Sequence, residues 1–158
     1  MGDSVTPAIL IDAIKREKAY REAEASLAGF TKHAFSIIEP GVAFKDNWHL
    51  HAIAEHLEAV SDGEIDNLVI NIPPGTMKSI IVSVMWPVWE WLENSTLRYM
   101  GASYGVDLAI RDAMKSRDII TSPWYQDRWG DSVKIRPGSD QKTQYELVSG
   151  GSRIATSV

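Results

Sequence analysis

The chain contains no cysteine, which excludes disulfide bonds and thiolate metal sites. It also lacks any apolar run near the roughly 18 residues that cross a bilayer. Its first residues, MGDSVTPAIL, are acidic and show no basic segment followed by an apolar one, so we expect no secretory signal. Positive charge is scarce as well, because 16 Lys and Arg against 21 Asp and Glu give a formal net charge of -5. These residues are therefore not expected to bind nucleic acid on their own, since phosphate neutralisation needs a basic face.

What is present is the composition of an ordinary globular domain with one core: 158 residues, 44% hydrophobic and 23% charged. The first part reads as three helices. Residues 7–28 are rich in helix formers and end at Gly29, and residues 30–38 form a second, apolar helix. A third helix begins at Asn47, which can cap it, and ends near Asp62.

Strand patterns begin after the third helix. We predict a buried strand at 68–72, a helix at 78–92, a strand at 97–102 and an amphipathic helix at 106–120, before a β meander in the tail. This order predicts an α/β fold in which the strands 68–72 and 97–102 are parallel and are joined by a right-handed crossover helix. In the amphipathic helix, Leu108 is expected to face inward and Asp112 outward.

The stretch NLVINIPPGTMKSIIVSVMW, residues 67–86, has the order of a phosphate-binding loop: strand, tight turn, Lys-Ser, helix. In such loops backbone N–H groups at a helix N-terminus converge on the anion, lysine contacts the outer phosphates and the Ser hydroxyl joins the Mg²⁺ shell. The usual spelling, G-x-x-x-x-G-K-[ST], would place glycines where this chain has Ile72 and Met77, and only Gly75 remains. On the motif alone, phosphate binding and a plain strand–turn–helix connection stay equally open.

From about residue 30 to residue 158 the chain resembles the large terminase subunit of tailed bacteriophages and prophages, the ATPase of the DNA-packaging motor. The matching stretches, in order, are EPGVAFKDNWHLHAIAEHLEAV, NLVINIPPGTMKS, WPVWEW, ASYGVDLAIRD, SPWYQDRWGD and SGGSRIATSV. Many members of that family spell the loop with Pro-Pro-Arg and Gly-Lys-Ser. A branch with Pro-Pro-Gly-x-Met-Lys-Ser resembles this chain, so Met77 fits as a feature of the branch.

The resemblance implies an α/β, P-loop NTPase-like three-layer sandwich with a mainly parallel sheet and N-terminal helices, binding ATP and Mg²⁺ through a Walker A loop. Lys78 would be the catalytic contact to the outer phosphates, and Ser79 would ligate Mg²⁺. The cofactor-binding set would comprise Pro74, Gly75, Thr76, Met77, Lys78 and Ser79, together with Trp48 and His49. The last two open a helix where such ATPases contact the base, although core packing is an equally good reading of them.

The resemblance also implies the organisation: a helical segment at 1–45 and a P-loop ATPase domain at 46–158. No run of four apolar residues followed by Asp-Asp or Asp-Glu occurs, and in the family that acidic metal-binding strand and a nuclease domain come later. We therefore expect negligible ATPase and nuclease activity from these residues alone. With its second domain, such a protein works in the host cytoplasm on double-stranded viral DNA, as an oligomeric ring with the small terminase subunit and the portal protein, and not at a membrane. The alternative is a non-hydrolysing module of the same fold that docks the small subunit or the portal.

Other groupings favour structural roles. A metal site is disfavoured for three histidines whose separations fit helical ligand pairs poorly: His49, His51 and His56. Core packing is expected for three tryptophans after the loop: Trp86, Trp89 and Trp91. A solvated helix face is the favoured reading of a modest basic edge that could otherwise face DNA: Arg111, Lys115 and Arg117. A transition-state arginine, absent from the loop, would have to come from Arg153 or a neighbouring subunit.

Overall fold

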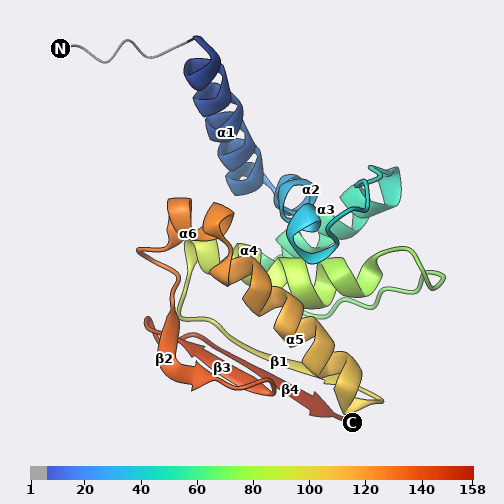
Figure 1. The fold of residues 1–158 in the computed structure, drawn as a ribbon. Coiled ribbons are helices and arrows are strands. Elements are labelled where there is room, and N and C mark those ends of the chain that lie inside the picture. The colour runs from blue at the N-terminus through green and yellow to red at the C-terminus, as the bar shows by residue number, and fades with distance from the viewer. Residues whose placement is uncertain (1–6) are drawn as a thin grey trace.

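The structure is a computed structural model that describes residues 7–158 (Figure 1). The elements follow one another as α1 (Pro7–Ala25), α2 (Leu27–Ile38), α3 (Trp48–Ser61), η1 (Ile80–Met85), α4 (Trp86–Glu93), β1 (Arg98–Ser103), α5 (Val106–Thr121), α6 (Pro123–Trp129), β2 (Ile135–Asp140), β3 (Gln144–Leu147) and β4 (Ser152–Ser157). The predicted α/β class is confirmed. None of the described helices is both long and apolar enough to span a membrane.

The sheet has four strands in the order β1-β4-β3-β2. β1 and β4 are parallel, with Tyr99 opposite Arg153, whereas β4 pairs with β3, and β3 with β2, in antiparallel register. The sheet is thus mixed, where the resemblance implied a mainly parallel one. Figure 1 shows the described helices on one side of this sheet, with α5 lying across β1 and β4.

The predicted strand at 68–72 is wrong for this structure. The residues have no regular secondary structure, and none of the described strands pairs with them. Nor is the segment buried throughout, as predicted, because its side chains alternate: Leu68, Ile70 and Ile72 pack half-buried against the core, while Val69 is 91% exposed. The alternation of a strand is therefore present, but a strand also needs a neighbour for its backbone N–H and C=O groups.

The first helix ends at Ala25, three residues before the predicted last residue 28. The Ser26 side chain caps α2 by accepting a hydrogen bond of 3.0 Å from the Gly29 N–H. Gly29 then lies inside α2, where a Cβ atom would come within 2.0 Å of the Glu22 carbonyl oxygen. The glycine permits the close approach of α1 and α2 and does not terminate a helix.

The helices predicted from Asn47, at 78–92 and at 106–120 lie close to their predicted limits, whereas α6 was not predicted. Asn47 holds the N-cap position of α3, although its side chain makes no capping hydrogen bond. The helix predicted at 78–92 is continuous from residue 78 to Glu93, through the π-helical η1 and then α4. In α5 two side chains differ from the prediction, because Leu108 is 48% exposed and Asp112 only 8%. The tail segments predicted at 144–148 and 152–156 form β3 and β4, whereas β2 begins at Ile135, the last residue of the segment predicted at 133–135.

The core joins helices and sheet around Trp91, which is fully buried. Its indole Nε1–H donates to the Leu97 carbonyl over 3.0 Å, and its ring packs edge-on against Tyr99 and Tyr145. Trp86 and Trp89 are partly buried against the same core, so the packing role predicted for the three tryptophans is confirmed.

Glu22 provides a pH-dependent link between α1 and α2. Hydrogen bonds from His33 and Lys32 lower the pKa of Glu22 from 4.5 to about 2. A depressed carboxylate pKa stabilises the fold above pH 4.5, and this contribution disappears as the pH falls towards 2. We expect Glu22→Gln to lower the free energy of unfolding near neutral pH and the difference from wild type to vanish near pH 2. Urea unfolding across this range measures the difference. Glu55→Gln, at an exposed position on α3, is the control that should change little.

Candidate phosphate-binding loop and adjoining cavity

The loop between the extended segment and η1 has the backbone of a tight left-handed turn. Gly75 has φ 81° and Met77 has φ 62°, and the helix begins at Lys78. A positive φ costs a side-chain-bearing residue about 1–2 kcal/mol, so such a conformation in Met77 must be imposed by its surroundings. Met77 thus adopts the kind of conformation that glycine, present there in the usual spelling, takes at no steric cost.

The loop surrounds a cavity of about 540 Å³ lined by nine consecutive residues, Ile72 to Ile80. Thr76 stabilises the turn, because its hydroxyl donates to the Pro73 carbonyl over 2.8 Å. No carboxylate lines the cavity, and among the described residues none forms an ion pair with Lys78. Ser79 is exposed at the start of the helix. The predicted residues 74–79 therefore lie together in this loop. Lys78 among them carries a positive charge that no described carboxylate neutralises.

The start of α3 lies beside this loop. His49 Nε2 lies 3.3 Å from the Thr76 carbonyl oxygen, so this nitrogen carries the hydrogen in that contact. Trp48 is 77% exposed, and its ring stands edge-on to that of His49 at 6.1 Å between centroids. The core reading of Trp48 is wrong. Trp48 and His49, the two residues predicted to contact the base, therefore lie beside the loop. His49 contacts Thr76 of the loop directly, and Trp48 contacts His49.

The histidines and the basic edge noted in the sequence do not form further sites here. His51 contacts Asp46 and His56 contacts the Ala52 carbonyl, so the three histidines have three different partners. Within residues 7–158, no three His, Cys, Asp or Glu side chains are grouped to hold a metal ion. Two members of the basic edge are neutralised, since Arg111 pairs with Asp112 and Lys115 with Glu39.

A feature that sequence reasoning missed lies one helical turn beyond the loop. Pro87 has no backbone N–H, so the Ser83 carbonyl four residues earlier lacks its α-helical donor. Arg153 of β4 supplies the donor instead, through Nη2. The proline within a predicted helix was the available signal, because it leaves a carbonyl free at the i−4 position; its partner could not be read from the sequence.

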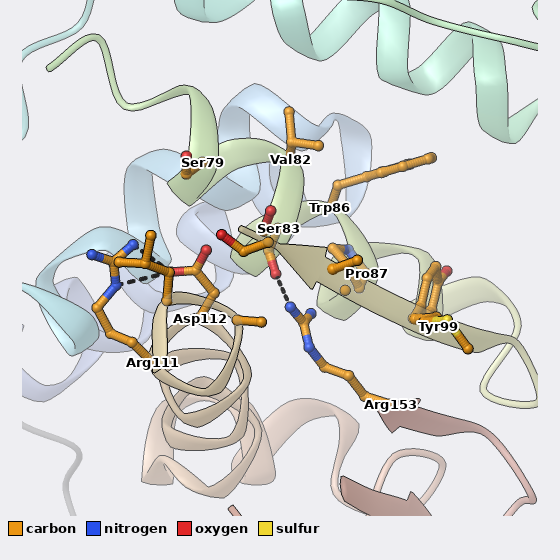
Figure 2. Close-up of a pocket in the computed structure, with 15 residues that line it drawn as sticks. Ser79, Val82, Ser83, Trp86, Pro87, Tyr99, Arg111, Asp112 and Arg153 are labelled. Atoms are coloured by element: carbon orange, nitrogen blue, oxygen red, sulfur yellow. Dashed lines mark hydrogen bonds and ion pairs between the residues drawn. The ribbon is translucent and has the colours of Figure 1, made fainter. Parts of the chain in front are cut away.

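Arg153 lies at the edge of a second cavity, of about 360 Å³, between η1, α4, β1 and α5 (Figure 2). The side chain is only 2% exposed, and its Nε and Nη1 have no hydrogen-bond partner. Burial lowers the pKa of the Arg153 guanidinium. Arg153 was considered above only as a transition-state arginine, yet the structure places it beneath η1, bonded to that helix.

The comparisons with known proteins add no relative: no family model, no curated protein and no solved structure matches the chain.

The left-handed turn predicts a specific effect of alanine at position 75. Gly75→Ala should lower the free energy of unfolding by about 1 kcal/mol, because φ 81° strains any residue with a Cβ atom. Contacts do not contribute, since nothing lies within 4 Å of the added Cβ. Gly63 is the matched comparison, because its φ is 75° and its added Cβ also meets nothing within 4 Å, so Gly63→Ala should cost about as much. No measurable loss in Gly75→Ala by urea unfolding would contradict the left-handed geometry.

Proposed function

We propose that this chain is the N-terminal, ATP-binding part of a terminase large subunit, with ATP–Mg²⁺ held by residues 74–79. The observation that carries the proposal is the left-handed turn at Gly75 and Met77 directly before Lys78, at the start of a helix and around a cavity without carboxylates. The ordered matches along the sequence support the same assignment. The double-stranded DNA, small-subunit and portal partners, the ring assembly and the host cytoplasm follow from this proposal.

The residues fit the nucleotide in their chemistry. Backbone N–H groups at the start of the helix can donate to phosphate oxygens, and the helix dipole favours the anion there. Lys78 adds a positive charge, and the exposed Ser79 hydroxyl is a suitable Mg²⁺ ligand. The magnesium ion would neutralise charge on the phosphates. The exposed Trp48 ring offers a face on which an adenine base could stack.

Turnover requires groups beyond these. Phosphoryl transfer depends on a carboxylate or amide that positions water and on acidic ligands that complete the metal shell. The loop cavity contains no carboxylate, so we propose that residues 1–158 bind nucleotide but hydrolyse it negligibly. The P-loop sandwich belongs to the same proposal, supported by the parallel pair of β1 and β4 and by the one-sided burial of residues 68–72.

Isothermal titration tests nucleotide binding directly. ATP with Mg²⁺ should bind to the chain, whereas AMP, which lacks the outer phosphates, should show no measurable affinity at the same concentrations. Trp48→Ala should weaken ATP binding by about 5- to 150-fold, because base–aromatic stacking contributes about 1–3 kcal/mol. Equal affinities for AMP and ATP would contradict a phosphate-binding role for the loop.

The alternative, a non-hydrolysing interaction module, is favoured by one observation. The outer half of α1 projects from the body (Figure 1) and exposes four aliphatic side chains: Ile9, Leu10, Ile11 and Ile14. Exposed apolar groups of this kind mark interaction sites in many proteins. Nucleotide titration separates the two functions, since a pure docking module would bind no ATP while a small terminase subunit or portal protein would still associate through α1.

A further inference from the structure

The second cavity has at its edge a buried guanidinium whose hydrogen bonds are incomplete. Arg153 is 2% exposed, its Nη2 donates to the Ser83 carbonyl, and its Nε and Nη1 remain without partners. Buried charges in proteins are normally paired and fully hydrogen-bonded, because an uncompensated one costs several kcal/mol. Asp112 acts on this charge through space, but no described group accepts a hydrogen bond from Nε or Nη1.

The nearby acids are already engaged elsewhere. Asp112 lines the same cavity, but its Oδ1 accepts hydrogen bonds of 3.0 and 2.8 Å from Arg111, and no ion pair joins it to Arg153. Glu90 accepts the hydroxyl of Tyr99, another lining residue. Figure 2 shows Arg111 and Asp112 paired on α5 and Arg153 directed separately towards Ser83.

We propose that the cavity between η1 and β1 is a binding site for a carboxylate, which accepts hydrogen bonds from Arg153. A singly charged acceptor suits the two unpartnered nitrogens of Arg153, while the Asp112 carboxylate in the same lining disfavours more highly charged anions. A planar carboxylate also matches the planar donor set of arginine in shape and charge. The cavity adjoins the nucleotide loop, because Ser79 lines both, but the proposal does not require that nucleotide binds to the loop.

The form of the cavity suggests where the carboxylate comes from. Five consecutive residues of β1, Tyr99 to Ser103, line it, and β1 is the edge strand of the described sheet. An extended segment lying along such an edge could place an Asp or Glu side chain over Arg153. A free small carboxylate could supply the same group, so the experiment includes both sources.

The probes are sodium acetate and two blocked five-residue peptides of valine, one with a central Asp and the other with a central Asn. We expect the Asp peptide to raise the midpoint of thermal unfolding and the Asn peptide to leave it unchanged. If acetate alone reproduces the rise, the free carboxylate is the source. The Nε–H resonance of Arg153 should move downfield with whichever probe binds, which tests the contact without any substitution.

Four variants locate the effect. Arg153→Met should weaken carboxylate binding about tenfold or more, and Arg153→Lys should restore part of it. Asp112→Asn removes the competing charge from the lining and should strengthen binding. Lys78→Ala should leave the response unchanged, which separates this site from the nucleotide loop. The proposal is overturned if no probe shifts the Arg153 resonance or the unfolding midpoint, or if Lys78→Ala abolishes the response.

Discussion

Lys78→Ala is expected to weaken the binding of ATP–Mg²⁺ by roughly 10- to 150-fold while leaving the fold intact. A charge-assisted hydrogen bond to phosphate contributes about 1.5–3 kcal/mol, which converts to that range. The lysine forms no ion pair with the described residues, so its removal leaves no buried carboxylate behind. Isothermal titration of both proteins measures the affinity ratio, and circular dichroism verifies that the variant is folded.

The matched control is Lys142→Ala, which removes one positive charge from an exposed position between β2 and β3. It should leave the affinity for ATP–Mg²⁺ within twofold of wild type at physiological salt, because screening reduces the effect of distant exposed charges. Equal losses in the two variants would show that ATP responds only to net charge. Equal affinity of wild type and Lys78→Ala would place the phosphates elsewhere on the molecule.

Trp91→Ala is expected to lower the free energy of unfolding by about 3–5 kcal/mol. The side chain is fully buried, and the substitution would remove its ring contacts with Tyr99 and Tyr145 and leave the Leu97 carbonyl without its donor. Domains of this size have total stabilities of about 5–15 kcal/mol, so the variant should unfold at much lower urea concentration. Its unfolding curve measures the loss.

Trp48→Ala is the control for this effect, because that ring is 77% exposed. It should change the free energy of unfolding by less than about 0.5 kcal/mol. The two tryptophans thus separate stability from function: the first holds the helices against the sheet, and the second affects only the proposed contact with the base. A large stability loss in Trp48→Ala would show that its ring packs within the core.

Local patterns predicted most helices and two of the three tail strands, β3 and β4. The apolar periodicity of α3 and α5, the capping position of Asn47 and the alternation in the tail depend on neighbours within a few residues, and these interactions are encoded locally. The order of Lys78 and Ser79 after an apolar segment similarly indicated where a loop would meet a helix. The helix begins at Lys78, as that order predicted.

Tertiary contacts decided the rest. The sequence predicts Gly29 as the end of a helix, but it lies within α2. Glycine is needed there because the Glu22 carbonyl of α1 leaves no room for a Cβ atom. Residues 68–72 have the alternation of a strand without its pairing, because a strand requires backbone partners that lie far away in sequence. Pro87 cannot donate to the Ser83 carbonyl, and Arg153 donates to it instead. Only the packing of β4 under η1 brings Arg153 and Ser83 together. The sequence by itself determined where most helical and extended segments form. The tertiary structure decided which backbone groups find partners, since hydrogen bonds between distant segments depend on how those segments pack.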